Sequence, residues 1–234
     1  FFFKQKTAYE IRNCDWSSDV CSSDLVFLSD LLRKRKVPQP DTRILIRQPQ
    51  EKLLAALAGL GYPMVLKIPD GSFSKGVVKV ANEEELMDSL RDLFRKSALV
   101  LAQEYLYTDY DWRIGVLNNR AIYACKYFMV RDHWQIYRYG GTGDVDSGHF
   151  QTMPTHEAPR AVIEAALRAT RSIGNSLYGV DIKQSGDRMA VIEVNDNPSI
   201  EAGVEDEYLG VDLYYLIMED FLRRLDDQRA NRPR

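Results

Sequence analysis

The sequence lacks an excess of charge of either sign and lacks a long apolar run. It carries 31 basic and 34 acidic residues, a formal net charge of −3. Nothing in this balance predicts nucleic acid as a partner. No apolar segment approaches the ~20 residues that a transmembrane helix needs. We therefore expect a protein that neither binds nucleic acid nor spans a membrane.

The first 25 residues lack the features of a folded segment or of a targeting signal. They read FFFKQKTAYEIRNCDWSSDVCSSDL and show neither a helical nor a strand period. They also lack the apolar run and the small-residue cleavage site of a signal peptide. The stretch resembles a conceptual translation of a sequencing-library adapter. We interpret 1–25 as an artefactual, disordered leader on a protein truncated at its amino terminus; the alternative is a genuine disordered leader.

Cysteine is scarce. Of the three cysteines, Cys14 and Cys21 fall in this leader, and only Cys125 remains. One cysteine cannot form a disulfide framework, so we expect a reducing, cytoplasmic location. Cys125 lies in an apolar segment and is most simply a small buried residue.

The rest of the chain predicts short strands and helices joined by antiparallel turns, an α+β fold in two lobes. Residues 131–156 read as a glycine-bearing loop. Expected helices are 26–36, 50–60, one that follows Asn82 and has apolar positions through Phe94, 159–175 and 213–225. Asn82, with Glu85 three residues on, has the spacing of a capping box. Expected strands are 42–46, a hairpin over 62–80, 100–105, 111–116 and 121–130 with a turn at Asn118-Asn119, 179–184 and 189–195. The expected domains are a small lid subdomain with its linker helix (26–104), a core subdomain (105–228) and a frayed tail (229–234).

The strongest chemical signal is a pair of strands near the end of the chain. Asp181 lies on the first strand, and Glu193 and Asn195 lie on the second. Side chains at i and i+2 leave a strand on the same face, and the intervening turn returns Asp181 alongside them. Magnesium prefers such hard oxygen ligands. The sequence thus predicts a metal site, although a solvated hairpin end would show the same spacing.

A second signal is a lysine inside a strand, followed by a glycine-bearing loop. Lys67 lies in MVLKI, and the loop that follows supplies Gly71, Ser74, Lys75 and Gly76. Glycines let backbone N–H groups approach phosphate oxygens, and lysines add positive charge. Most such turns bind nothing, and the order is not that of a Walker motif.

A third group of residues follows the strand LAQEYL. Glu104 and Tyr105 end this segment, and Asp111 and Arg113 come soon after. A hinge of this kind can offer backbone groups to a base and a carboxylate to a ribose. Taken alone, the pattern is weak because carboxylates at strand ends are common.

In this order the motifs resemble the ATP-grasp superfamily, and within it the RimK-like glutamate ligases, over 26–225. The resemblance implies a two-lobed ATP-grasp fold with ATP and Mg²⁺, or Mn²⁺, as cofactors. It assigns the nucleotide to Lys67, the loop, the hinge residues Glu104 and Tyr105, and Asp111. Asp181, Glu193 and Asn195 would hold the metal. Arg113 and Lys126 would face the site as the catalytic pair.

The chain departs from the family pattern in two places. A further ATP-binding lysine of the family would fall near Leu25, but the next lysine is Lys34. The family's amino-terminal domain is also missing, so we expect the truncated chain to bind nucleotide poorly and to be inactive. In the loop from Arg131 to Thr152 the chain lacks the family's Arg-x-Asn, which leaves the substrate open.

The leading hypothesis is an ATP-dependent ligase that joins a carboxylate to an amine through an acyl phosphate, on an amino acid or a peptide. One alternative is an ATP-grasp kinase acting on a hydroxyl. Another is a non-catalytic or regulatory nucleotide-binding module, and the last is an α+β binding domain without nucleotide. Expected partners are small-molecule or peptide substrates. The sequence is compatible with a homo-oligomer and does not identify one.

Overall fold

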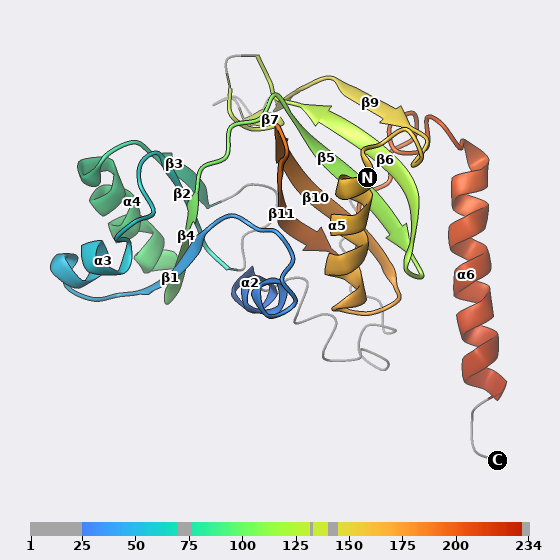
Figure 1. The fold of residues 1–234 in the computed structure, drawn as a ribbon, viewed down its shortest axis with the longest axis horizontal. Helices are drawn as coiled ribbons and strands as arrows, with labels where there is room; N and C mark the ends of the chain where they lie inside the picture. Colours follow the sequence, from blue (N-terminus) through green and yellow to red (C-terminus); the bar gives the residue numbers. More distant parts are fainter. Residues whose placement is uncertain (1–24, 70–75, 132, 140–144, 231–234) are drawn as a thin grey trace.

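The structure is a computed structural model that describes residues 25–69, 76–131, 133–139 and 145–230. Two antiparallel sheets form two lobes that lie side by side (Figure 1). This arrangement confirms the expected α+β fold in two lobes. No helix within the described ranges is long and apolar enough to cross a membrane.

The small lobe is a four-stranded sheet in the order β1-β4-β2-β3, packed against two helices. Its elements are β1 (Thr42–Ile46), α3 (Gln50–Ala56), β2 (Met64–Lys67), β3 (Val77–Val80), α4 (Glu83–Lys96) and β4 (Leu99–Glu104). Asn82 caps α4 by accepting the Glu85 amide at 2.9 Å, and the Glu85 carboxylate accepts the Ala81 amide at 2.8 Å. This arrangement confirms the expected capping-box start of the helix.

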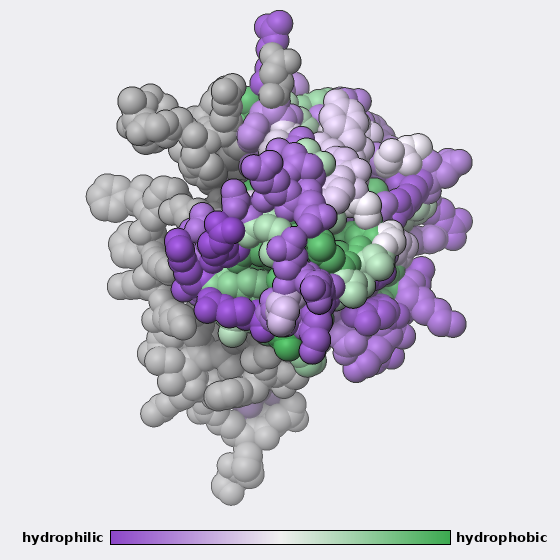
Figure 2. Space-filling view, turned by 90° about the vertical axis from the view of Figure 1, so that its left-hand side faces the viewer, coloured by the Kyte–Doolittle hydropathy of each residue, from purple (hydrophilic) through white to green (hydrophobic). Residues whose placement is uncertain are grey.

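The small-lobe surface visible in Figure 2 is mostly hydrophilic, with hydrophobic residues showing in its middle. Its sheet core is closed: Leu66, Val80 and Ala102 have no exposed surface. The polar surface and the closed core are typical of an ordinary solvent-facing lobe.

The large lobe is a five-stranded sheet in the order β11-β10-β5-β6-β9. The strands are β5 (Tyr110–Leu117), β6 (Arg120–Phe128), β9 (Phe150–Met153), β10 (Leu177–Ser185) and β11 (Arg188–Asn195). Helices α2 (Leu25–Lys34) and α5 (Arg160–Arg171) pack with one face of this sheet. A separate two-stranded ribbon pairs β7 (Tyr137–Tyr139) with β8 (Val145–Ser147).

Alternation along these strands gives the sheet two different faces. Trp112, Ile114, Val180 and Ile182 are buried in the core that contains α5. Residues that oppose one another in an antiparallel pair share a face, and Asp181 opposes Arg113 while Ile182 opposes Trp112. The charged residues of β5 and β10 therefore lie on the face away from α5.

The last helix, α6 (Val211–Ala230), lies at the outer edge of the large lobe (Figure 1). Its first turns pack Leu213 and Ile217 against Leu117 and Tyr123. Further along, Arg224 donates to the side chain of Asn175 at 3.1 Å. The helix is longer at both ends than the expected 213–225, and it includes residues 229 and 230, which were expected to fray.

The prediction of a loop over residues 131–156 was wrong in part. β9 pairs with β6, from Ala124 opposite Met153 to Tyr127 opposite Phe150, and the ribbon β7–β8 precedes it. These strands are only three or four residues long, too short to show an alternating pattern. In contrast, the turn at Asn118-Asn119 is confirmed, with φ values of 48° and 61° that suit a two-residue hairpin turn.

Candidate active site

The β10–β11 hairpin brings the three predicted metal ligands together. Asp181 lies opposite Glu193, and Asn195 lies opposite Gly179, one pair further along the same face. A register shift between Asp181 and Ile182 places an extra residue on β11 at Ile192. The Asn195 amide nitrogen lies 3.4 Å from a carboxylate oxygen of Asp181. The convergence expected from the i, i+2 spacing is present.

Arg113 holds the Asp181 carboxylate from the neighbouring strand. Its Nε and Nη2 donate to the two carboxylate oxygens at 2.8 and 2.9 Å. Both side chains are less than one-fifth exposed. The Asp181 charge raises the pKa of Arg113 well above its ordinary value, against the opposing effect of burial. Two parallel, charge-assisted bonds of this kind fix orientation as well as charge.

Beside Arg113 lies a tyrosine that is hydrogen-bonded to a buried glutamate. The guanidinium carbon of Arg113 lies 5.2 Å from the centre of the Tyr127 ring. The Tyr127 hydroxyl donates to Glu205, which is 1% exposed and also accepts the Glu201 amide at 2.8 Å. Burial and this hydrogen bond raise the pKa of Tyr127. Glu205 therefore orients Tyr127, whose ring lies beside the Arg113 guanidinium.

Asp111 is paired with a lysine that the sequence analysis did not single out. Lys183 Nζ lies 2.6 Å from Asp111 Oδ1, and Thr108 donates to the same oxygen at 3.0 Å. Burial raises the pKa of Asp111, and the Lys183 charge partly offsets this rise. Lys183 is two residues from Asp181 on β10, so the alternation of a strand could have placed it on the same face. Asp111, the predicted ribose contact, would therefore share its carboxylate between the ribose and Lys183.

Lys67 ends strand β2 of the small lobe, and the charges of the large-lobe cluster act on it. Burial lowers the pKa of Lys67, while the charges of Glu193, Asp111 and Asp181 favour its protonated form. Burial and the Asp181 charge in turn raise the pKa of Glu193, against the influence of Lys67. Charged groups from both lobes therefore interact at this place. Burial penalises the charged forms of Lys67, Asp111 and Glu193.

The glycine-bearing loop is described only at its end. Gly71, Ser74 and Lys75 lie outside the described residues. Gly76 has a φ of +83°, and a Cβ there would lie 2.8 Å from the Ile68 side chain. Both the dihedral and the contact require glycine at this position. The predicted phosphate role of the loop remains a prediction.

The hinge residues are engaged in different ways. Arg188, in β11, donates to the two carboxylate oxygens of Glu104 at 2.6 and 2.7 Å, which joins the hinge to the large lobe. These bonds lower the pKa of Glu104. The Tyr105 ring lies under Lys79 Nζ at 4.8 Å and edge-on to Trp134 at 6.1 Å. Arg188 thus occupies the Glu104 carboxylate, and the Glu104 amide donates to the Asp41 carbonyl at 2.9 Å.

The structure does not bring Lys126 to this cluster. Lys126 lies opposite Trp112, whereas Arg113 lies opposite Cys125, so Lys126 is on the α5 face of the sheet. Its Nζ lies 4.6 Å from the Tyr110 ring centre and 4.9 Å from that of Trp112. Cys125 is buried, as expected, and burial raises the pKa of its thiol to about 11.

The comparisons with known proteins agree with this geometry. A model of the RimK-like ATP-grasp domain matches residues 23–220. The chain belongs to the RimK-like ATP-grasp family. It is 29% identical over 240 residues to a probable alpha-L-glutamate ligase of Vibrio atlanticus, covering 96% of this chain and 74% of the relative. To its counterpart in Saccharophagus degradans it is 30% identical over 226 residues, covering 89% and 69%.

Other similar proteins are D-alanine–D-alanine ligases. The enzyme of Pediococcus pentosaceus is 31% identical over 146 residues, covering 59% of this chain and 40% of the relative. A crystal structure from Bacillus anthracis superposes with a TM-score of 0.71 at 19% identity, covering 91% of this chain and 71% of that one. This likeness shows the fold, and the expected two-lobed ATP-grasp architecture is confirmed. The chain spans 54% to 74% of the length of the first three glutamate-ligase relatives.

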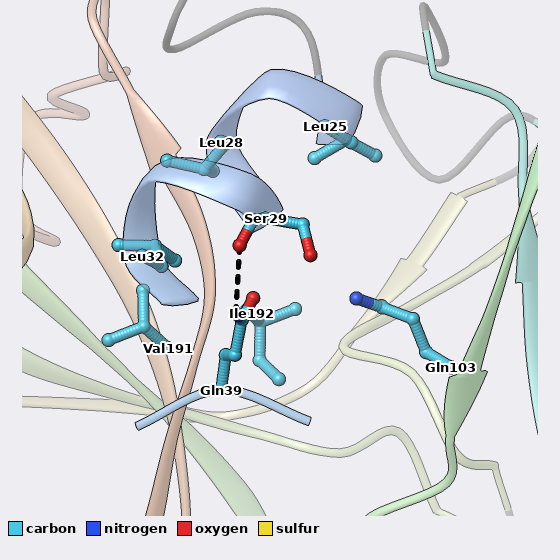
Figure 3. A pocket seen from close by; sticks show the side chains of 8 residues that line it. All are labelled: Leu25, Leu28, Ser29, Leu32, Gln39, Gln103, Val191 and Ile192. Carbon is cyan, nitrogen blue, oxygen red and sulfur yellow. Dashed lines mark hydrogen bonds between the residues drawn. The ribbon is translucent and has the colours of Figure 1, made fainter. Parts of the chain in front are cut away.

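A small pocket of this RimK-like domain lies between the lobes but apart from the charged cluster. Figure 3 shows its lining from α2, β4, β11 and the segment after α2: Leu25, Leu28, Ser29, Leu32, Gln39, Gln103, Val191 and Ile192. Gln39 Nε2 donates to the Ser29 carbonyl at 2.8 Å. None of the predicted site residues lines this pocket. We interpret it as a packing gap beneath α2.

Proposed function

We propose that this protein is an ATP- and Mg²⁺-dependent ligase that joins the carboxylate of an amino acid or peptide to an amine. The observation that carries the proposal is the cluster on the face of the large sheet away from α5. There Asp181, Glu193 and Asn195 converge beside Arg113, and Lys67 approaches from the other lobe. The names of the relatives, glutamate ligases and D-alanine–D-alanine ligases, support amino acids as substrates.

The three candidate ligands fit a magnesium ion by their chemistry. Among the described residues no group of three or more His, Cys, Asp or Glu could hold a metal, so a softer nitrogen–sulfur site has no support there. The hairpin instead supplies two carboxylates and one amide, all oxygen donors. Because the nitrogen of Asn195 faces Asp181, its oxygen remains available to a cation. A bound magnesium, or manganese, would neutralise the charge of the nucleotide phosphates.

The residues of the chain would then act by positioning and charge. A carboxylate is a poor electrophile, and transfer of the terminal phosphoryl group of ATP to its oxygen gives an acyl phosphate and ADP. The amine attacks the acyl carbon, the carbon–oxygen bond to phosphate breaks, and phosphate and a proton leave. Lys67 would contact the phosphates, and Arg113 would hold Asp181 in place while its positive charge favours phosphate oxygens nearby.

A cytoplasmic location is part of the same proposal. ATP is the co-substrate, and the sequence from residue 26 onward has a single, buried cysteine, which suits a reducing compartment. The small-molecule or peptide carboxylate and the amine would be the partners. Nucleic acid and membrane have no role in this chemistry.

The test is binding followed by product analysis. Calorimetry with ATP and magnesium, on a protein extended to the full length of these relatives, is expected to give micromolar binding, about −8 kcal/mol, and Glu193→Gln is expected to weaken it at least tenfold. Lys126→Met, which removes a charge from the other face of the sheet, should leave it unchanged. Incubation with candidate amino acids and amines should then release phosphate and form an amide.

Each other outcome is also informative. A stable phosphoester product would identify a kinase acting on a hydroxyl. Binding without any turnover across the screened substrates would favour a regulatory nucleotide-binding module. If a protein extended to the full length of these relatives binds no nucleotide, the ligase proposal is wrong and only the fold is shared.

A further inference from the structure

Two ion pairs lie next to each other on the face of the large sheet away from α5. Arg113 of β5 opposes Asp181 of β10, and two residues along each strand Asp111 opposes Lys183. The polarity of the second pair is reversed, because its cation is on β10. All four side chains are less than one-quarter exposed. The two pairs differ in how much of the carboxylate the cation occupies.

Arg113 occupies both oxygens of Asp181, whereas Lys183 occupies only one oxygen of Asp111. The guanidinium of Arg113 donates once to each oxygen. Lys183 Nζ lies 2.6 Å from Asp111 Oδ1, and the Thr108 hydroxyl lies 3.0 Å from the same atom. In the part of the chain that the structure describes, no hydrogen bond or ion pair reaches Asp111 Oδ2. A partly buried acceptor without a donor costs free energy, so Oδ2 is suited to a ligand that supplies one.

Thr108 and Lys183 together fix the orientation of Asp111. Lys183 Nζ also donates to Thr108 Oγ1 at 3.0 Å, so the ammonium, the hydroxyl and Oδ1 form a closed triangle. An ammonium only donates and an ionised carboxylate only accepts, so the hydroxyl accepts from Lys183 and donates to Asp111. Thr108 is 6% exposed, and the next carbonyl, that of Asp109, accepts the Met129 amide at 2.9 Å. The carboxylate is therefore held by one oxygen from a fixed backbone.

The charge of Lys183 indicates which kind of donor Oδ2 would accept. Burial raises the pKa of Asp111, whereas the charge of Lys183 and the hydrogen bonds from Lys183 and Thr108 lower it. These bonds favour the ionised carboxylate, which accepts a hydroxyl donor more strongly than a neutral group does. A second cation at Oδ2 would be repelled by the ammonium already present. The arrangement therefore favours an uncharged donor such as a hydroxyl group.

The neighbours of Asp111 indicate where such a hydroxyl would come from. The charge of Asp111 acts on Lys67, the proposed phosphate contact. The segment that joins β4 to β5 begins after Glu104 and carries Thr108, and the family resemblance assigns its first residues to the base. Asp111 therefore lies between the groups proposed for the phosphates and for the base. The part of a nucleotide that connects these two is the sugar.

We propose that Lys183 and Thr108 are positioning residues, which hold Asp111 by Oδ1 and leave Oδ2 to accept from the hydroxyl groups of the nucleotide sugar. Lys183 thereby makes the site selective for a ribonucleotide. This inference rests on the proposed function, because it requires that the cluster binds ATP. It predicts a preference between two nucleotides that carry the same phosphates and the same base.

The experiment compares ATP with 2′,3′-dideoxy-ATP by calorimetry with magnesium, on a protein extended to the full length of the relatives. We expect the wild type to bind ATP about tenfold more tightly, as one hydrogen bond to a charged group would give. Lys183→Met should weaken ATP binding about fivefold and leave dideoxy-ATP binding nearly unchanged, so that little of the preference remains. Lys183→Arg should retain part of the preference, because a guanidinium keeps the charge and has donors for both Thr108 and Asp111.

Two further variants separate positioning from charge and from folding. Lys126→Met is the matched control: it removes a lysine from the opposite face of the sheet and should leave both affinities unchanged. Asp111→Leu/Lys183→Met replaces the ion pair by apolar residues, so that neither charge is left without its partner. This double variant should be folded by its melting curve and should bind the two nucleotides equally. It supplies the same test if Lys183→Met alone does not fold.

The contrary outcomes are distinct. Equal weakening of both nucleotides by Lys183→Met would show that Lys183 acts on the phosphates by its charge, and would overturn the positioning role. Persistence of the preference in the double variant would overturn it as well. Equal affinity of the wild type for ATP and dideoxy-ATP would overturn the sugar contact and leave the proposed ligase function intact. Failure of the wild type to bind either nucleotide would overturn both.

Discussion

On β5 and β10, neighbouring residues serve opposite faces of one sheet. Trp112 and Ile182 are buried against the helices, whereas Arg113 and Asp181, one position away on each strand, form an ion pair on the other face. The first face gains stability from area removed from water. The second holds partly buried charges, whose loss of hydration is offset only by their partners. Substitutions on the two faces should therefore separate stability from binding.

The largest effect is expected on the apolar face. Ile182 has no exposed surface, so Ile182→Ala removes buried methyl groups and leaves a cavity. We expect a loss of about 2–5 kcal/mol in the free energy of unfolding, measured by urea denaturation, with nucleotide affinity unchanged in the fraction that is folded. A loss below about 1 kcal/mol would mean that this face is not the tightly packed core.

Arg113→Met tests the charged face. It leaves the Asp181 carboxylate in place without the Arg113 guanidinium. We expect a loss of about 3 kcal/mol in the free energy of unfolding, together with weaker magnesium–nucleotide binding. Lys126→Met likewise replaces a cation by methionine, on the adjacent strand and the opposite face of the sheet. Its effect on nucleotide binding should be negligible. Asp181→Asn added to Arg113→Met should recover part of the stability. If both methionine variants weaken binding equally, the assignment of Lys126 to the other face is wrong.

A smaller effect should follow from the support beneath Arg113. Tyr127→Phe removes the donor to Glu205, which is buried, and an unsatisfied buried acceptor costs about 1–3 kcal/mol. Tyr214→Phe is the matched control, because the Tyr214 hydroxyl donates to Asp206 at an exposed site. We expect its effect to stay below about 0.5 kcal/mol, again by urea denaturation. Equal effects of the two substitutions would show that water replaces Tyr127 at Glu205.

The same comparison shows how much the sequence could predict. Spacing within one hairpin was sufficient to bring Asp181, Glu193 and Asn195 together, because strand alternation and a short turn are local properties. The capping box at Asn82 and the turn at Asn118-Asn119 were predictable for the same reason.

Contacts between strands distant in sequence were not predictable. The pairing of Arg113 with Asp181 depends on β10 lying beside β5, and periodicity carries no information about that order. The placement of Lys126 depends on the register of β5 with β6, which shifts between Gly115 and Val116. The contact of Glu205 with Tyr127 had no sequence signal, because 78 residues separate the two. The lone strand β9 was missed because its partner is β6, more than twenty residues earlier.

The smallest expected effect is the pH dependence of the stability that two glutamates contribute. It tests most sharply whether their surroundings differ. The bonds from Arg188 lower the pKa of Glu104, whereas burial and Asp181 raise the pKa of Glu193 above its ordinary value of 4.5. Glu104 therefore contributes stability that is present above pH 4.5 and is lost as the pH falls through its lower folded pKa. For Glu193 the folded state keeps a proton that the unfolded chain has already lost, so its contribution falls as the pH rises from 4.5 to the raised value.

Urea denaturation of Glu104→Gln and Glu193→Gln from pH 3 to pH 8 measures both contributions. Relative to the wild type, Glu104→Gln should become more destabilising as the pH rises toward 4.5 and then level off. Glu193→Gln should become less destabilising, or stabilising, as the pH rises above 4.5. Added magnesium and ATP should reduce the second trend if Glu193 holds the metal, because a bound cation favours the charged carboxylate. Parallel curves for the two variants would mean that both carboxylates lie in similar surroundings, and the distinction between a lobe-joining ion pair and a metal site would fail.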